Sequence, residues 1–392
     1  MRKIPAAILV LALLAGLISG SALAADYPGK DEVDRAVDGY FRKARTIGGS
    51  LVIMKDGQVV YERDYGLRSV NSRLPVDENT YFKMGSVTKM ICAMAVLQLV
   101  DEGKLDLDAD ISQYFGYRIV NPYYPKTPLT LRQLLSHTST VSESGGYSRL
   151  TNTVERMLGD PRRSAANFQQ AEPGSHYRYS NFGAGLAGSI VEAVSGQSLA
   201  RFMQERVFEP LGMDASLAAN WLQSPEDISN LHKDGKLFKA GARYVREGYE
   251  DTASPETHYR TLVGGLFIRS RDLARLTHAL ATDGSLDGHR LLSPENVMLM
   301  REQQHLLGKS VTAPSPYGLF MERNTRLLPG KIVYGHQGMT GGANNNAYFE
   351  PESGFVFALT TNGGSQVRDH GTVVLAQNLL RYTYPLFSGE NN

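Results

Sequence analysis

Gly85-Ser86-Val87-Thr88-Lys89 is followed by an apolar run from Met90 to Val100. The run predicts a helix, with Ser86 in its first turn and Lys89 one turn later on the same face. A serine hydroxyl is a weak nucleophile until a neighbouring base takes its proton, and a desolvated lysine can be that base. Free N–H groups at a helix start also favour a developing oxyanion. The S-x-x-K stretch therefore predicts Ser86 as a nucleophile, provided that the rest of the chain supplies its partners.

Two later motifs supply such partners. Tyr179-Ser180-Asn181 offers a phenol that can relay protons and an amide that can orient a lysine or hold a substrate carbonyl. His336-Gln337-Gly338 follows the strand-like Ile332-Val333-Tyr334. A glycine at that place lets a substrate backbone approach the strand closely. We expect all three motifs to meet in one site.

With these three motifs in this order, the chain resembles the serine β-lactamase and penicillin-binding-protein superfamily. It is most similar to the branch of class C β-lactamases, D-Ala-D-Ala carboxypeptidases, D-aminopeptidases and related esterases. Further segments carry the resemblance over nearly all of the chain after residue 24; they are Leu131 to Ser139, Pro210-Leu211-Gly212-Met213, Gly264-Gly265-Leu266 and Ser270-Arg271-Asp272-Leu273-Ala274.

The resemblance implies a role for each motif residue. Ser86 would be the acylated nucleophile, Lys89 would activate it, and Tyr179 would pass the proton to the leaving group. Asn181 would hold the substrate amide. The backbone N–H groups of Ser86 and Met339 would form the oxyanion hole, beside the substrate-binding His336 and Gly338.

The chain departs from the family pattern at three positions. His336 stands where Lys is usual, as in some peptidase-like members. Gln337 replaces the Thr or Ser that often binds a terminal carboxylate, which puts recognition of a free C-terminal carboxylate in question. Thr140 replaces the Gly that usually follows Leu135-Ser136-His137-Thr138-Ser139. We interpret that segment as structural, with His137 a hydrogen-bonded core or loop histidine.

Strand-like segments lie at both ends of the chain, and helical ones lie between them. They predict an α+β fold, with one antiparallel sheet built from the N- and C-terminal segments, flanked by helices, and an inserted, mostly helical lobe. We place the α/β part at about residues 25–85 and 258–392 and the lobe at about 86–257. The expected strands are 50–54, 59–65, 262–268, 317–321, 332–334, 347–349 and 355–361, and the expected helices are 31–46, 130–136, 182–194, 198–207, 270–282 and 372–382. Residues 221–257 show little periodicity and predict a long, partly ordered excursion.

The chain opens with a secretory pattern. Arg2 and Lys3 precede an uncharged apolar stretch from Ile4 to Gly20, and Ala22-Leu23-Ala24 is a small-residue cleavage site. The apolar stretch is short for a membrane span. We therefore expect a signal peptide at residues 1–24, removal before Ala25, and a periplasmic or secreted protein with no membrane span after cleavage.

Composition excludes several classes of protein. Arg2 and Lys3 are the only charged residues before Ala25, so the formal net charge of +1 becomes −1 without them. This balance gives no reason to expect a nucleic-acid partner. Cys92 is the only cysteine, so no intramolecular disulfide forms, and we expect a buried structural thiol there. The sequence has no P-loop, no H-E-x-x-H and no G-x-S-x-G elbow, so we predict no metal and no cofactor.

The function predicted is an exported serine hydrolase that acts through an acyl-enzyme on small peptide-like amides, such as D-amino-acid peptides, or on esters. A class C-like β-lactamase or a promiscuous esterase is the alternative within the enzyme class, with β-lactams as acylating ligands. A non-catalytic penicillin-binding sensor is the alternative from another class. Lys89 must be neutral to act as a base, so we expect burial and nearby positive charge to lower its pKa toward about 7–8.

Overall fold

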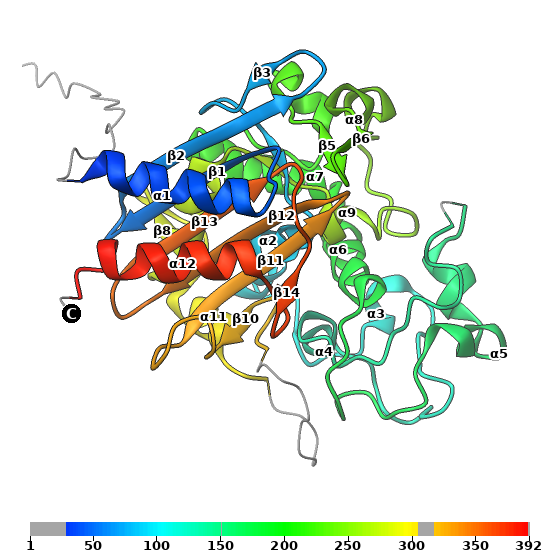
Figure 1. Ribbon diagram of the computed structural model, residues 1–392. Coiled ribbons are helices and arrows are strands. Elements are labelled where there is room, and N and C mark those ends of the chain that lie inside the picture. The colour runs from blue at the N-terminus through cyan, green and yellow to red at the C-terminus, as the bar shows by residue number, and fades with distance from the viewer. Residues whose placement is uncertain (1–28, 150, 305–316, 391–392) are drawn as a thin grey trace, which may run out of the picture.

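The computed structural model describes residues 29–149, 151–304 and 317–390, and the predicted signal peptide at 1–24 lies outside them. A seven-stranded sheet runs in the order β10-β11-β12-β13-β1-β2-β3, and every neighbouring pair is antiparallel. Its strands are β1 (Gly48–Lys55), β2 (Gln58–Ser69), β3 (Leu74–Pro75), β10 (Glu322–Asn324), β11 (Val333–Thr340), β12 (Ala343–Glu350) and β13 (Phe355–Thr361). The pairing of β1 with β13 joins the two ends of the chain in one sheet, which confirms the predicted fold class (Figure 1).

The pair Asp56-Gly57, between two strand-like segments, predicts a hairpin turn, and the first hairpin forms there. Asp56 and Gly57, between β1 and β2, have φ angles of 49° and 80°. Two positive φ angles twist a two-residue turn in the sense that antiparallel strands require, and Asp-Gly tolerates them.

Helices cover both faces of the sheet because its buried side chains alternate. Leu51 and Ile53 pack with the two terminal helices, α1 (Lys30–Lys43) and α12 (Val374–Phe387), which lie side by side across one face (Figure 1). Val52 and Met54 point to the opposite face and join a second, larger core. Helix α10 (Ser270–Ala281) packs there against β1, β12 and β13.

Helix α2 (Val87–Asp101) lies in this second core between the sheet and the lobe. Every residue from Val87 to Leu99 is buried, as expected for a helix that is apolar all round. A glycine predicts a helix end, and Gly103, with φ 68°, lies just beyond the end of α2. The helix contacts α6 and α7 of the lobe as well as β11 and β12 of the sheet, so its first turn lies where the two parts meet.

The lobe is mostly helical. Its longest helix, α6 (Asn181–Ser195), begins within the second motif. The shorter elements are α3 (Ser112–Phe115), α4 (Leu131–Leu135), α5 (Pro161–Ser164) and α7 (Leu199–Met203), and a π-helical turn at Gln204–Phe208 continues α7.

The predicted excursion at 221–257 contains a hairpin, β5 (Leu231–Lys233) with β6 (Lys236–Lys239), and helix α8 (Gly241–Glu247). Two strand predictions fail. In place of the strand expected at 262–268, the structure has helix α9 (Thr261–Gly264) followed by the short strand β7 (Phe267–Ile268), which pairs with β4 (Phe82–Lys83). The first part is helical because its packing against α2 and α6 overrides the strand preference of its residues. The strand expected at 317–321 is a turn in which Phe320 has φ 48°, and β10 begins only at Glu322.

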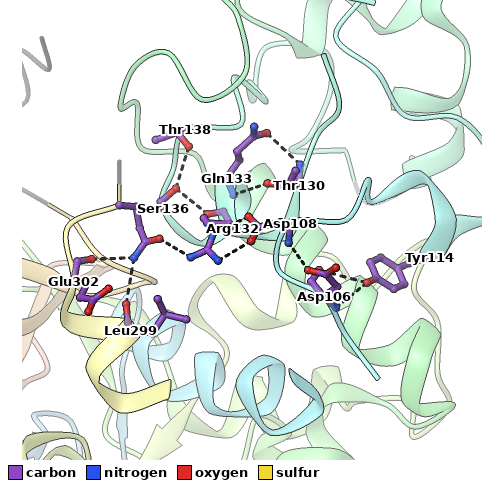
Figure 2. Close-up of polar contacts among 11 residues, drawn as sticks. Asp106, Asp108, Tyr114, Thr130, Arg132, Gln133, Ser136, Thr138, Leu299 and Glu302 are labelled. Atoms are coloured by element: carbon purple, nitrogen blue, oxygen red, sulfur yellow. Dashed lines mark hydrogen bonds and ion pairs between the residues drawn. The ribbon is translucent and has the colours of Figure 1, made fainter. Parts of the chain in front are cut away.

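Helix α4 fixes the segment that leads to His137. Thr130 and Gln133 form a reciprocal capping box at its start. Arg132 donates two hydrogen bonds, of 2.7 and 2.8 Å, to the Asp108 carboxylate and a third, of 2.9 Å, to Gln304 Oε1 (Figure 2). The Gln304 amide in turn donates to backbone carbonyls at the end of α11 (Pro294–Arg301). Arg132 therefore links the lobe to the C-terminal half of the chain.

Across residues 29–149, 151–304 and 317–390, no helix is both long and apolar enough to cross a membrane.

Candidate active site

The turn that carries Ser86 is pressed against strand β11. Gly85, directly before it, has φ 56°, and a Cβ there would lie 2.9 Å from the Met339 carbonyl oxygen and 3.0 Å from Met339 N. Ser86 is the N-cap of α2 and is only half-buried. The Ser86 hydroxyl therefore lies at the start of α2, beside the backbone of Met339, and is partly exposed although the helix itself is buried.

Lys89 lies one helical turn after Ser86, as the motif spacing predicts. Its Nζ donates to Ser86 Oγ at 3.1 Å, to Asn181 Oδ1 at 2.9 Å and to the Val263 carbonyl oxygen at 2.9 Å. The side chain is fully buried. Burial lowers the pKa of Lys89 to about 7.

One part of the expectation for Lys89 is wrong. Nearby positive charge was expected to assist burial, but the charged groups that influence the Lys89 pKa are the Glu143 carboxylate and the Cys92 thiol, and both raise it. Desolvation is therefore the one cause that lowers the Lys89 pKa, and its effect is large enough to make the amine a base near neutral pH. The Cys92 thiol is buried, as predicted, and burial raises its pKa.

The Tyr179 ring also lies beside the Lys89 side chain. The Lys89 Nζ is 5.1 Å from the centre of the Tyr179 ring, and the Ser86 side chain lies near enough to the Tyr179 hydroxyl to act on its pKa, in the lowering direction. Desolvation raises the pKa of Tyr179 well above its ordinary value. The phenol therefore keeps its proton at neutral pH and can relay one proton while it accepts another, whereas Lys89 is the group able to act as the base.

Asn181 completes the arrangement around Lys89. It is the first residue of α6, and its side-chain oxygen is occupied by Lys89. Its backbone N–H donates to Glu143 Oε1 at 2.5 Å. Within the described ranges the Asn181 side-chain nitrogen donates to no protein group, so its N–H groups can meet a substrate carbonyl, as the resemblance implies.

Gly338 is needed for a different reason from the one predicted. A Cβ at Gly338 would overlap the Met84 carbonyl oxygen and lie 2.9 Å from the backbone nitrogens of Ser86 and Val87. The glycine therefore lets the Ser86 turn, rather than only a substrate backbone, approach β11. This contact sets the N–H groups of Ser86 and Met339 at one junction, where an oxyanion hole is expected.

His336 is buried beside this junction. Its Nε2 lies 2.6 Å from the Tyr317 hydroxyl, and its Nδ1 lies 2.6 Å from the Gln337 carbonyl oxygen. Because a carbonyl only accepts, Nδ1 carries the proton and Nε2 accepts from Tyr317. Burial, with the neighbouring Lys89 charge, lowers the pKa of His336 to about 3. His336 therefore does not supply the positive charge of the Lys usual at this place.

Gln337 does not present its amide to the site as a free donor. Its Nε2 donates to the Gly371 carbonyl oxygen at 3.1 Å and to Glu322 Oε1 at 3.4 Å. It therefore cannot take over the role of the missing hydroxyl without breaking these contacts.

A pocket of about 440 Å³ adjoins Ser86. It is lined by Ser86, Tyr177, Tyr179, Glu322, His336, Gln337, Met339 and Arg368. Sequence reasoning missed Tyr177, Glu322 and Arg368. Tyr177 lies two residues before Tyr179, and that proximity could have indicated it. Glu322 and Arg368 are isolated charged residues in segments without a motif, and only the pairing of β10 with β11 brings Glu322 to the site.

His137 supports Tyr179 from behind. It is buried with φ 57°, its Nδ1 accepts from the Ser180 N–H at 3.3 Å, and its ring centre is 4.2 Å from that of Tyr179. Its Nε2 is buried without a partner in the described ranges, so the predicted hydrogen bonding is only half complete. Thr140 takes the left-handed φ of 65° that the family's glycine would adopt, and its Oγ1 accepts from Asn121 Nδ2 at 2.9 Å.

Two other polar segments near the motifs do not line the pocket beside Ser86. Arg178 lines a neighbouring pocket of about 370 Å³ that shares Tyr179 with the first. The polar run Asn344-Asn345-Asn346 is compatible by sequence either with lining the cleft or with a solvated turn, and its burial in β12 excludes the solvated turn. Asn345 donates to the Lys83 carbonyl oxygen at 2.8 Å and so anchors the strand before Ser86.

Comparison with known proteins finds a matching family model and several relatives. A sequence model of the family described as Beta-lactamase matches residues 33–379. The chain is 28% identical over 327 residues to penicillin-binding protein 4 of Amycolatopsis lactamdurans, which covers 81% of each chain. It is 34% identical over 242 residues to esterase EstB of Burkholderia gladioli, covering 58% of this chain and 59% of the esterase.

Solved structures share the fold. The octameric penicillin-binding protein homologue from Pyrococcus abyssi superimposes with a TM-score of 0.69 at 24% identity, covering 92% of this chain and 78% of that one.

Proposed function

Since the chain belongs to the Beta-lactamase family of serine hydrolases, we propose that it is an exported enzyme that cleaves peptide-like amides, such as D-amino-acid peptides, or esters through an acyl-Ser86 intermediate. One observation carries the proposal. The buried Lys89 amine, with a pKa of about 7, lies 3.1 Å from the Ser86 hydroxyl. That pair is an activated nucleophile with its base in place.

Acylation would proceed with Lys89 neutral. Lys89 takes the Ser86 proton, Ser86 Oγ forms a bond to the substrate carbonyl carbon, and the carbonyl oxygen becomes an oxyanion at the N–H groups of Ser86 and Met339. The tetrahedral species then collapses, the carbon–nitrogen or carbon–oxygen bond to the leaving group breaks, and the proton reaches the leaving group through Tyr179.

Deacylation would use the same groups with water as the nucleophile. A water molecule loses a proton to the base, attacks the acyl carbon and displaces Ser86 Oγ, which regains a proton. The products are a carboxylic acid and an amine or alcohol, and the enzyme returns to its starting state. Asn181 would hold the substrate carbonyl side with its free N–H groups during both steps.

The substrate class rests on the relatives as well as on the site. The likeness to esterase EstB supports ester substrates, and the likeness to penicillin-binding protein 4 supports substrates that, like penicillin, contain an amide carbonyl. A class C-like β-lactamase or a promiscuous esterase is the alternative within this chemistry, and a penicillin-binding sensor without turnover is the alternative outside it. A β-lactamase, an esterase and a sensor would differ in how fast their acyl-Ser86 intermediate is hydrolysed.

The proposed export rests on the N-terminal sequence, where Arg2 and Lys3 precede the uncharged Ile4 to Gly20 stretch and the Ala22-Leu23-Ala24 site. Expression of the full chain in a Gram-negative host, followed by fractionation and N-terminal sequencing, tests it. The expected product begins at Ala25 in the periplasmic fraction. A cytoplasmic product that keeps Arg2 and Lys3 would refute it.

Intact-protein mass spectrometry after incubation with benzylpenicillin, beside Ser86→Ala, tests the mechanism. A lasting adduct on the wild type alone favours a penicillin-binding peptidase, whereas loss of penicillin without an adduct favours a β-lactamase. With neither, turnover of 4-nitrophenyl acetate by the wild type favours an esterase. An adduct that persists in Ser86→Ala, or no reaction with either compound, contradicts the proposed function.

A further inference from the structure

The pocket beside Ser86 holds two opposite charges that do not pair with each other. Glu322 on β10 and Arg368 on β14 (Arg368–Asp369) both line it. In the part of the chain that the structure describes, no direct ion pair joins them, although Arg368 is near enough for its charge to lower the pKa of Glu322. Two facing but separate charges can be bridged by a ligand that carries both opposite charges.

The hydrogen bonds to the Glu322 carboxylate come from neutral donors. The Tyr348 hydroxyl donates to its Oε2 at 3.0 Å, and the Gln337 amide donates to its Oε1 at 3.4 Å, which is a weak contact. The Gln337 backbone N–H is a third neutral donor. A carboxylate can accept about four hydrogen bonds, so capacity for one more remains. Desolvation raises the pKa of Glu322 to about 6, although these donors and the Arg368 charge act to lower it. A cation bound in the pocket would compensate for that desolvation.

Arg368 offers the complementary site. It is exposed, and its guanidinium contacts the Met339 sulfur at the edge of the pocket. A guanidinium fork matches a carboxylate with two parallel hydrogen bonds. Because the Gln337 amide is already used by Gly371 and Glu322, Arg368 is the group at this pocket best suited to hold a substrate carboxylate.

Tyr179 indicates which half of the substrate enters the pocket. In the proposed function its hydroxyl passes the proton to the leaving group, and Tyr179 lines this pocket together with Ser86. The leaving group therefore lies on the side of Glu322 and Arg368.

We propose that the enzyme prefers a leaving group that is an amino acid with a cationic side chain, with its carboxylate at Arg368 and its side-chain ammonium at Glu322. This inference rests on the proposed function for the direction of the substrate and adds no covalent step to it. Glu322 would be the residue that sets specificity, and the third-motif Gln337 would serve to position it.

Binding to Ser86→Ala protein tests the preference without turnover. The probes are acetyl-D-Ala-D-Lys and acetyl-D-Ala-D-norleucine, which share the carbon chain but differ in the terminal ammonium. Calorimetry is expected to give at least about tenfold tighter binding of the lysine peptide, the low end for a hydrogen bond to a charged group. Adding Glu322→Gln should remove the difference, whereas Glu322→Asp, which keeps the charge, should retain part of it. Glu295→Gln, an exposed acid on α11, is the matched control and should keep all of it.

Arg368→Gln is expected to weaken both peptides by a similar factor, because both carry the carboxylate. Equal binding of the two peptides to Ser86→Ala, or a lysine preference that survives Glu322→Gln, would overturn the inference. The outcome is separate from that of the proposed function. Wild-type protein that is acylated at Ser86 but shows no peptide preference refutes only the inference, whereas peptide preference without any Ser86 acylation refutes only the hydrolase.

Discussion

The side-chain nitrogen of Lys89 lies 3.1 Å from the hydroxyl oxygen of Ser86. The lysine is fully buried, so the environment that places it next to Ser86 also lowers its pKa to about 7. Proximity and basicity therefore have the same structural origin.

This origin predicts the pH dependence of the reaction. Only neutral Lys89 accepts a proton, and the neutral fraction falls below the pKa, so kcat/KM should drop about tenfold per pH unit below about 7 and level off above it. Lys89→Met should lower kcat/KM at least about 100-fold and abolish this limb. Steady-state kinetics across the pH range provides the measurement.

Lys83 is a matched control for this experiment. Burial lowers its pKa to about 7 as well, but its ammonium lies over the rings of Tyr244 and Phe267, 4.9 and 4.5 Å from their centres. Lys83→Met should leave the position of the acidic limb unchanged. A limb that disappears with Lys83→Met and persists with Lys89→Met would contradict the assignment of the base.

Tyr179→Phe separates the phenol's proton relay from its packing. The variant keeps the ring against Lys89 and His137 but removes the hydroxyl beside Ser86. We expect kcat to fall by about 10²–10³-fold on amide substrates, with an unchanged melting temperature. Amines are poorer leaving groups than 4-nitrophenolate, so the loss should be smaller on 4-nitrophenyl acetate. Equal losses on both substrates would speak against proton delivery by Tyr179.

Gly338→Ala should disrupt the junction between β11 and α2. The added Cβ would overlap the Met84 carbonyl oxygen, so the strand or the Ser86 turn must move. We expect loss of acylation together with a lower melting temperature. Gly39→Ala in α1 is the control, because a Cβ there meets nothing within 4 Å and should stabilise the protein by about 0.5–1 kcal/mol. Full acylation in Gly338→Ala would refute this account of the glycine.

His336 should stay neutral wherever the enzyme is active. Its pKa is lowered to about 3 by burial, and its two ring nitrogens are engaged by Tyr317 and the Gln337 carbonyl. Nuclear magnetic resonance of ring-labelled histidine, with His336→Gln to assign the signal, should show no titration above about pH 5. A His336 signal that titrates near 6.5 would show that the imidazole is exposed to solvent or paired with an acid.

Local pattern was sufficient for much of this protein. The apolar run after Ser86 predicted α2, Asp56-Gly57 predicted the first hairpin turn, and the i, i+3 spacing placed Lys89 beside Ser86. These features depend on residues close in the chain, whose geometry is set by helix period and by the φ angles that each residue tolerates.

Contacts between distant segments could not be predicted in this way. The Val263 carbonyl bound by Lys89 belongs to a segment that composition assigned to a strand, and packing against α2 and α6 made it helical. Glu322 enters the pocket only because β10 pairs with β11, and Gln337 is occupied only because Gly371 lies beside it. The residues of each motif lie close together in the sequence, so their chemistry can be predicted from it. Desolvation, charge pairing and pocket shape depend on side chains that the fold brings together from distant parts of the chain.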